Sequence, residues 1–533
     1  MPLKASSDET YQFIQGCLSD CLQNHPLCRE ESQGLDDEEW PRRILAIDPL
    51  SSQVKLIEFN VTMAQQYTAL SYCWGPVPPP IRASLSTLHK LKRGLSISSL
   101  PQTLEDAVLA SIKLGSYLIW IDSLCIIQDD SSDWEKESCK MSTVYRHALL
   151  TIIASCSSSC NEGFLDRERD APVLLQRLEL GGQWTEVRAR KVSRVGYHRP
   201  YKYDHGGEHR GVEPVDIRGW TLQEKLLSPR SVTFTSDEVQ WECRAVKRCE
   251  CNQPPSEGAM NHLSLSPMEE WFSTLEDYTT RRLTNKTDRL VALSGISKAM
   301  SRSLHARYAA GIWVTTESTM LMVKGLLWHK VPGITRPSFA PEEYLAPSFS
   351  WASIMGEVIH HKMGRLQSHS YLSRILEVDL ILGAPDPFGS VAHGTLGLEG
   401  KLVRTKMSWR KIESKLKMPP FIELPIWGST CYIDVPLKRV SLPEGGFTLQ
   451  RRTSANLEES EHFNDTTDYP ETEVIILPLI VYIEDSYIGQ VIAGLILGQC
   501  PTLQGYQRLG YTSFPSKAVE SLENINTEII CIY

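Results

Sequence analysis

The chain has 533 residues, of which 22% are charged and 41% hydrophobic, and a formal net charge of −9 at pH 7. This length allows two or more domains with sizeable cores, and the composition is that of an ordinary globular protein. The mild negative charge argues against a general nucleic-acid-binding surface, which would normally be basic. The N-terminal sequence MPLKASSDETYQ has no apolar segment of the secretory type. We therefore expect a cytoplasmic protein that does not bind nucleic acid.

The apolar runs and the cysteines lead to two further expectations. The longest apolar run, VIILPLIVYI (474–483), is interrupted by Pro478 and is shorter than the roughly twenty residues of a membrane span. This run and GQVIAGLILG (489–498) are typical of buried strands, so we expect no membrane span. The 14 cysteines are mostly scattered singly in apolar surroundings, which favours reduced thiols.

Residues 1–60 are expected to form an N-terminal helix and strand segment. A helical pattern at the start is followed by the acidic run EESQGLDDEEW (30–40). RILAIDP (43–49) and VKLIEF (54–59) then predict two short strands around a turn.

Two cysteine groups allow a metal-binding interpretation. Cys17, Cys21, His25 and Cys28 are spaced so that three or four of them could meet on one face of a helix start, and zinc prefers such ligands. Because zinc sites usually draw their ligands from two separated segments, we favour the alternative that this helix packs a small apolar face on the domain. The second group lies in a predicted turn and consists of Cys243, Cys249 and Cys251. We favour surface thiols there, and predict no metal site.

Residues 61–260 form the predicted α/β domain, in which strands and helices alternate. The predicted elements are strands in YTALSYCWG (67–75), YLIWI (117–121) and LLTIIA (149–154), and helices in 101–115, in 133–148 and in RGWTLQEKLLSPR (218–230). This alternation is typical of a parallel sheet with crossover helices, which binds ligands beyond the carboxyl ends of its strands. SVTFTSDEVQWECR (231–244) then predicts a strand hairpin.

An insertion at residues 160–217 interrupts this domain. Its basic part, RARKVSRVGYHRPYKYDHGGEHRG (188–211), fits either an exposed loop or a contact with a polyanion. A helical segment is predicted over 261–345 and a β-rich C-terminal domain over 346–533. Within that domain, the acidic, Ser/Thr-rich run at 454–473 predicts a disordered loop.

Five segments resemble the HET domain of fungal heterokaryon-incompatibility proteins and occur in that family's order. They are YTALSYCWG, LPQTLEDA, YLIWIDSLCIIQDD, DWEKE and RGWTLQE. The resemblance covers residues 67–244 and continues more weakly through APSFSWAS (346–353). It implies a role in allorecognition and programmed cell death, with the HET domain as the effector and a partner or second region that senses non-self.

The same segments are similar, more distantly, to TIR domains. The first strand of TIR domains also ends in a Ser-Tyr pair followed by Gly. In those TIR domains that cleave NAD, the catalytic Glu lies four residues after a Trp. Trp220 and Glu224 have that spacing here, although position 221 is Thr rather than Cys and the insertion at 160–217 precedes them. This resemblance implies a TIR-like, flavodoxin-like parallel sheet, followed by an α+β, β-rich C-terminal region, and NAD as a substrate rather than a resident cofactor.

The resemblance implies one catalytic carboxylate. Nicotinamide leaves NAD as a neutral amine, so a single Glu can hold the ribose and stabilise an oxocarbenium-like transition state without a second acid. Glu224 takes that role, and Trp220 would flank the nicotinamide. Asp122 would anchor a hydroxyl group of the substrate. The remaining candidates would line the nucleotide side of the binding site, and they are Ser71, Tyr72, Trp74 and Gly75.

Each assignment has an alternative in the sequence. Glu224 could form a structural ion pair with Arg218 or Arg230, Trp220 could be a core residue, and Asp122 could cap the next turn through Ser123 or a backbone N–H. The whole chain could instead be a non-catalytic, self-associating signalling module or an accessory regulatory protein that retains the HET fold. The expected partners are further copies of the chain or an incompatibility partner protein.

Overall fold

The computed structural model forms two compact units, Met1–Tyr203 with Glu208–Ser264, and Leu265–Tyr533. The described residues are 2–29, 40–64, 66–169, 173–180, 183–189, 212–251, 266–315, 318–330, 338–361, 369–410, 421–423, 430–435, 437–451, 453, 472–483, 490–515, 522 and 524–533. The predicted disordered loop at 454–473 lies outside them apart from its last two residues, and so does most of the basic run at 188–211.

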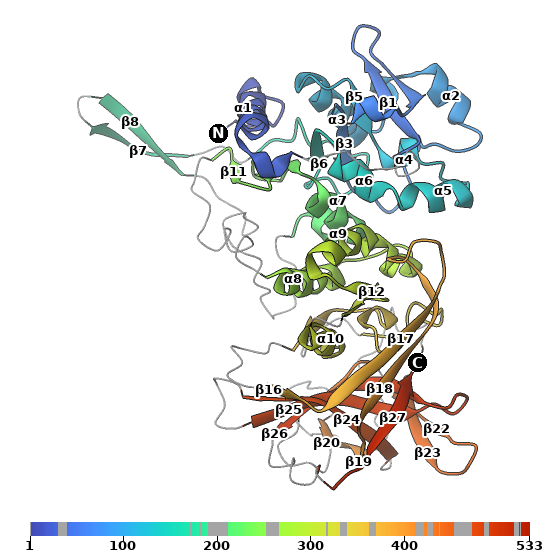
Figure 1. Cartoon of the computed structure of the whole chain (residues 1–533). Helices are drawn as coiled ribbons and strands as arrows, with labels where there is room; N and C mark the ends of the chain where they lie inside the picture. Colours follow the sequence, from blue (N-terminus) through green and yellow to red (C-terminus); the bar gives the residue numbers. More distant parts are fainter. Residues whose placement is uncertain are drawn as a thin grey trace. The chain divides into compact units, whose positions relative to one another are not determined.

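The first unit is an α/β structure (Figure 1). Its helices are α1 (Asp8–Asn24), α2 (Leu88–Arg93), α3 (Gln102–Lys113), α4 (Asp122–Cys125), α5 (Ser131–Ser138), α6 (Met141–Arg146) and α7 (Gly219–Leu227), with the short 3-10 turns η1 (Pro26–Cys28), η3 (Val61–Met63), η4 (Ile97–Ser99) and η5 (Pro214–Ile217). Its strands are β1 (Arg43–Asp48), β2 (Gln53–Glu58), β3 (Thr68–Ser71), β4 (Leu95–Ser96), β5 (Leu118–Trp120), β6 (Leu150–Ile153), β7 (Val173–Leu180), β8 (Gln183–Ala189), β9 (Arg230–Phe234), β10 (Val239–Cys243) and β11 (Lys247–Cys249).

A mixed sheet joins the strands of this unit, with the exception of the separate β7–β8 hairpin. The order is β11-β10-β9-β6-β3-β5-β1-β2-β4. At its centre β3 runs parallel to β5 and β6, and β6 runs parallel to β9. Numbered along the chain, these four parallel strands lie in the order 2-1-3-4. The predicted parallel sheet with crossover helices is therefore confirmed.

The sequence pattern explains the central elements. Strands β3 and β6 are buried along their whole length, as expected of strands covered on both faces. Helix α3 follows Pro101 and buries Leu104, Ala107 and Val108 at helical spacing. The helix predicted over 133–148 is instead two helices, α5 and α6, because the chain turns at Cys139 and Lys140.

Both predicted hairpins are present, and both extend the same sheet. The strands at 43–59 are β1 and β2, and β1 pairs antiparallel with β5. The strands at 231–244 are β9 and β10, and β11 continues the sheet beyond β10. The N-terminal strands are thus part of the sheet of the α/β domain.

The cysteines depart from the expectation of reduced thiols at one pair. Cys249 and Cys251 form a disulfide, and their Cα atoms are 5.3 Å apart, within the range that a disulfide can bridge. The other twelve cysteines are free thiols. In the second cysteine group, Cys249 and Cys251 are therefore joined to each other, whereas Cys243 is a free, buried thiol.

The second unit contains helices and a large, mostly antiparallel sheet. Its helices are α8 (Pro267–Thr280), α9 (Ser294–Leu304) and α10 (Thr319–Leu326), with the 3-10 turns η7 (Lys286–Arg289), η8 (Val291–Leu293) and η9 (Trp351–Ser353). Its strands are β12 (Arg307–Ala309), β13 (Ile312–Val314), β14 (Trp328–Lys330), β15 (Val358–His360), β16 (His369–Tyr371), β17 (Ser373–Leu382), β18 (Val391–Lys401), β19 (Val403–Arg410), β20 (Phe421–Glu423), β21 (Thr430–Ile433), β22 (Leu437–Ser441), β23 (Phe447–Arg451), β24 (Thr472–Ile483), β25 (Gln490–Gln499), β26 (Tyr506–Pro515) and β27 (Thr527–Ile532).

The main sheet of this unit has the order β17-β18-β27-β26-β25-β24-β19-β20, with β16 on β24 and β21 on β26. The prediction of a β-rich C-terminal region is confirmed. The apolar runs at 474–483 and 489–498 are the antiparallel strands β24 and β25, which are almost entirely buried. In the described part of the chain, no helix is both long enough and apolar enough to cross a membrane.

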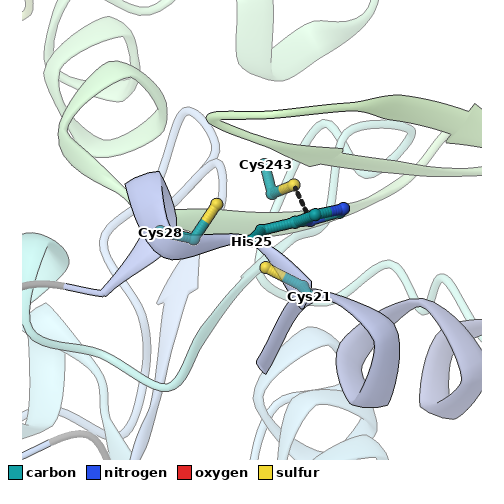
Figure 2. Close-up of side chains that lie close together, drawn as sticks. All are labelled: Cys21, His25, Cys28 and Cys243. Atoms are coloured by element: carbon teal, nitrogen blue, oxygen red, sulfur yellow. Dashed lines mark hydrogen bonds between the residues drawn. The ribbon is translucent and has the colours of Figure 1, made fainter. Parts of the chain in front are cut away.

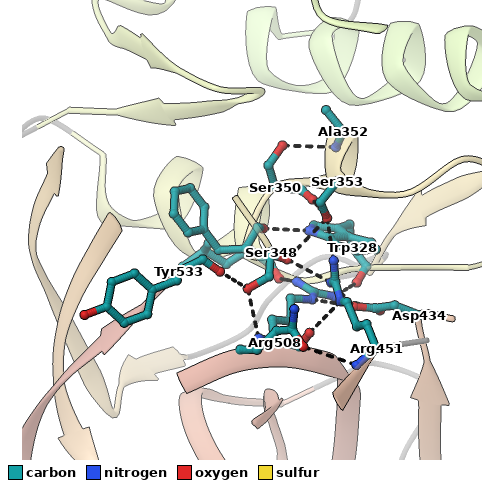
Figure 3. A network of polar contacts seen from close by, with 12 residues as sticks. Trp328, Ser348, Ser350, Ala352, Ser353, Asp434, Arg451, Arg508 and Tyr533 are labelled. Atoms are coloured by element: carbon teal, nitrogen blue, oxygen red, sulfur yellow. Dashed lines mark hydrogen bonds and ion pairs between the residues drawn. The ribbon is translucent and has the colours of Figure 1, made fainter. Parts of the chain in front are cut away.

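A buried ion cluster supports the second unit (Figure 3). Asp434 is fully buried and accepts hydrogen bonds from Arg451 (2.8 Å) and from Arg508 (3.0 Å). The Arg451 guanidinium also donates to the Ser353 hydroxyl (2.7 Å) and to the Ser348 carbonyl (2.9 Å). These serines belong to APSFSWAS (346–353), so this segment is tied to strands β23 and β26 by buried polar contacts.

Candidate active site at the ends of the parallel strands

The predicted site residues come together at the carboxyl ends of two neighbouring parallel strands. β3 ends at Ser71 and leads directly into Tyr72 and Trp74, and Asp122 opens the short helix α4 just after β5. Helix α7 contacts both β3 and β6 and carries Trp220 and Glu224, which lie one turn apart on the same face of the helix. In open α/β sheets this edge is where ligands bind.

Hydrogen bonds hold Asp122 in place. Trp74 donates its indole N–H to one carboxylate oxygen (2.9 Å), and the backbone N–H of Ser123 donates to the other (2.6 Å). The Tyr72 hydroxyl donates to the Ser123 hydroxyl (2.7 Å). The Asp122 carboxylate therefore accepts a hydrogen bond from the backbone N–H of Ser123 in the following turn, one of the contacts that the alternative interpretation named. Burial raises the pKa of this carboxyl, while Arg218 and the donors from Ser123 and Trp74 lower it.

Glu224 lies deeper than Asp122. Its side chain is only 5% exposed. Burial raises the pKa of the Glu224 carboxyl to about 7; the nearby Ser71 hydroxyl and the Arg218 charge lower this pKa, and the Asp122 charge raises it. The Ser71 hydroxyl is itself buried without a hydrogen bond of ordinary geometry among the described residues. A Glu with this pKa can hold or release a proton near neutral pH.

Two arginines were candidates for a structural ion pair with Glu224. Arg230 points elsewhere, because its described hydrogen bonds go to Cys21 Sγ and to the carbonyls of Cys28 and Leu149. Arg218 precedes the first residue of α7 and donates to the Tyr72 carbonyl. Its charge lowers the pKa of both Asp122 and Glu224. The pairing with Arg230 is thus wrong, and Arg218 is the cation shared by the two carboxyl groups.

Three tryptophans belong to the segments that carry these carboxyl groups. Trp74 and Trp220 are half-buried and pack against the core of the first unit, as does Trp134 from α5. The rings of Trp134 and Trp220 meet edge to face, with centroids 6.4 Å apart. Each indole therefore has one side in the core and part of its surface accessible, an arrangement suited to stacking on a planar ring.

Gly75 has a backbone role. Its φ is +93°, a conformation that favours glycine, and a Cβ at this position would lie 2.6 Å from the Cβ of Ser159. The residue lets the chain turn sharply after Trp74 while packing against the loop that follows β6. This close approach leaves no space for a side chain at position 75.

Other acidic residues of the same sequence segments have structural roles that sequence reasoning missed. Asp106 accepts hydrogen bonds from the backbone of Phe164 (2.7 Å) and Leu165 (3.0 Å). Asp133 forms a buried ion pair with Arg43 and so ties α5 to β1. The signal was present in the sequence, since both carboxylates occur in helices at positions that would face the core and so require partners.

Comparison with protein families identifies the segment that contains this site. Residues 67–224 match the family described as Heterokaryon incompatibility protein (HET). No curated protein and no solved structure gives a match. The matched segment begins next to β3 and ends at Glu224, so it contains every candidate site residue. Residues 67–224 are therefore identified as a HET domain, and the chain is a protein that contains a HET domain.

Proposed function

We propose that this protein acts in fungal allorecognition and programmed cell death, and that its HET domain contributes by TIR-like hydrolysis of NAD at Glu224. The family match supports the biological role. The strand order 2-1-3-4 supports the comparison with TIR domains, because flavodoxin-like sheets begin in this order and bind ligands where the order reverses. That point lies between β3 and β6, where α7 packs.

The observation that carries the catalytic proposal is the buried Glu224 carboxyl with its raised pKa. In the proposed reaction the bond between nicotinamide and ribose breaks, nicotinamide leaves with the electron pair, water adds to the ribose carbon and one proton is released. An ionised Glu224 would stabilise the positive charge that develops on the ribose, and its partly desolvated position would strengthen this effect. Since only the ionised form can do so, the rate should rise with pH as Glu224 loses its proton.

The neighbours of Glu224 fit the remaining parts of such a substrate. Trp220 lies one helical turn away and offers an indole surface for the nicotinamide. Asp122 on α4 is fixed by Trp74 and Ser123 and can accept a hydrogen bond from a ribose hydroxyl. Ser71 is the last residue of β3, and its hydroxyl would orient the Glu224 carboxylate.

A non-catalytic, self-associating module is the second candidate function. The observation in its favour is the β7–β8 hairpin, which stands apart from the main sheet and exposes Val173, Leu174 and Leu175. Exposed apolar residues on a two-stranded hairpin are suited to pairing with another chain. Under this function, replacing Leu175 with Lys would abolish activity while Glu224→Gln would have no effect.

Inducible expression in a fungal host distinguishes these functions. The catalytic proposal predicts that the wild-type chain kills the cells and that Glu224→Gln does not, at equal protein level. The exposed Glu135 on α5 provides a control with the same chemical change, and Glu135→Gln should kill as the wild type does. Equal killing by Glu224→Gln and wild type would contradict the catalytic proposal.

A further inference from the structure

Four potential metal ligands converge in the first unit, away from Glu224. The ligand atoms of Cys21, His25, Cys28 and Cys243 all lie within 4.8 Å of one another (Figure 2). The distance from His25 Nδ1 to Cys243 Sγ is 3.4 Å. Around a tetrahedral zinc ion, neighbouring sulfur and nitrogen ligands lie about 3.5 to 3.8 Å apart, given Zn–S and Zn–N distances of about 2.3 and 2.0 Å. We propose that these four side chains bind one structural zinc ion.

The local fold explains how the ligands meet. Helix α1 carries Cys21 in its last turn and ends at Asn24; His25 then leaves the helical conformation, and Pro26 opens the turn η1 that ends with Cys28. This reversal directs three ligands to one side, as Figure 2 shows. Cys243 comes from the end of β10. The ligands thus derive from two separated segments, the feature that zinc sites usually have and that the N-terminal cysteine group alone lacks.

The surroundings of His25 fit a metal ligand. Its Nδ1 faces Cys243, and its Nε2 lies 3.8 Å from a carboxylate oxygen of Asp20. Metal-binding histidines commonly direct their second nitrogen toward a carboxylate, which fixes the ring and favours the tautomer with a free metal-binding nitrogen. Asp20 is itself held by Arg248 at 2.7 Å.

Arg230 provides an independent argument from charge. Its side chain is 2% exposed, and its described hydrogen bonds go to Cys21 Sγ (3.3 Å) and to the carbonyls of Cys28 (2.7 Å) and Leu149 (3.4 Å). These partners are uncharged when the thiol is protonated, and a buried guanidinium without a counter-charge is costly. Three thiolates and one Zn²⁺ carry a net charge of −1 beside this guanidinium. The zinc–thiolate cluster would therefore supply the counter-charge of Arg230.

The closed character of the cluster indicates a structural rather than a catalytic site. Cys21 and Cys28 are fully buried, Cys243 is 7% exposed and the His25 side chain is 13% exposed, so the protein supplies all four ligands in a largely buried region. Catalytic zinc sites keep one position open for water. Three sulfur ligands and one imidazole also favour zinc over magnesium or calcium, which prefer oxygen.

The zinc ion would fasten the N-terminal segment to the sheet. Helix α1 and η1 precede the family-matched residues 67–224, and β10 follows them. One ion would thus join two segments on either side of the HET domain, and its binding energy would stabilise the folded unit. Cys17 is not part of the cluster, so the grouping suggested by the sequence is corrected to one that includes Cys243.

Metal analysis of the full-length protein, expressed with zinc in the medium, tests this proposal. We expect about one zinc per chain, and X-ray absorption should show three sulfurs at about 2.3 Å and one nitrogen at about 2.0 Å. Cys243→Ser should weaken zinc binding by about tenfold or more. Cys17→Ser is the matched control: Cys17 lies on the same helix, is buried to 4% exposure and is outside the cluster, so this variant should retain the zinc.

Two results would overturn the proposal. One is a folded wild-type protein that contains no zinc and, after addition of Co²⁺, shows no thiolate-to-cobalt absorption band. The other is equal zinc content in Cys243→Ser and Cys17→Ser. The cobalt spectrum requires no variant, so it decides the question even if Cys243→Ser fails to fold.

Discussion

Replacing Glu224 with Gln should stabilise the first unit at alkaline pH. The folded protein holds the Glu224 proton more tightly than the unfolded chain does, because burial raises the pKa from 4.5 to about 7. The contribution of the protonated Glu224 carboxyl to the free energy of unfolding is therefore fully present below pH 4.5, and it is lost as the pH rises to about 7. At 1.36 kcal/mol for each pH unit, the free energy of unfolding should fall by roughly 3 kcal/mol over this window.

Glutamine has nearly the same shape and stays neutral, so the variant should escape this loss. We expect equal stability at pH 5, within about 1 kcal/mol, and a more stable variant at pH 9, by an amount approaching roughly 3 kcal/mol. Labelling of the buried Cys125 thiol, which is 1% exposed, as a function of urea reports on the first unit alone. Glu135→Gln, at an exposed position, is the control and should follow the wild type at both pH values.

The opposite result would refute this reasoning. If Glu224 is an ionised partner of Arg218 with a purely structural role, Glu224→Gln would remove one of the two carboxylates that share the half-buried Arg218 guanidinium. The variant would then be less stable than the wild type at pH 9.

Three further predictions follow from individual contacts. Asp434→Asn should destabilise the second unit by about 3–5 kcal/mol in urea unfolding, because Arg451 and Arg508 lose their shared counter-charge; a loss below 1 kcal/mol would contradict this. Gly75→Ala should cost about 1–3 kcal/mol, since it combines a positive φ with a Cβ contact to Ser159, and an unchanged melting temperature would show that the turn relaxes freely. A strong chelator should lower the melting temperature of the wild type, and zinc should restore it; no change in melting temperature would count against the zinc site.

The sequence was sufficient to predict the elements that depend on local pattern. Runs such as YLIWI and LLTIIA are apolar throughout, and a helical stripe follows Pro101, so the parallel strands and their crossover helix could be inferred. The two apolar runs near the C-terminus were correctly identified as buried strands. Trp220 and Glu224 could be placed on one helix face because spacing alone fixes that relation.

Contacts between distant segments could not be predicted in this way. The pairing of β1 with β5 depends on sheet edges that no local pattern describes. The position of Cys243 beside His25 is set by the route of the chain over more than 200 residues. The burial that raises the pKa of Glu224 likewise results from packing of α7 against β3 and β6. Such features require the folded structure, because they join elements far apart in the sequence.

Nicotinamide release from NAD by the purified full-length protein tests the central claim most directly. The assay compares wild type, Glu224→Gln and Glu135→Gln at high protein concentration, with folding and self-association checked for each. We expect release by the wild type and by Glu135→Gln, with a rate that rises through about pH 7 as Glu224 ionises, and none by Glu224→Gln. No release from any of the three proteins, all folded and associating, would contradict the catalytic role of Glu224 and favour the self-associating module.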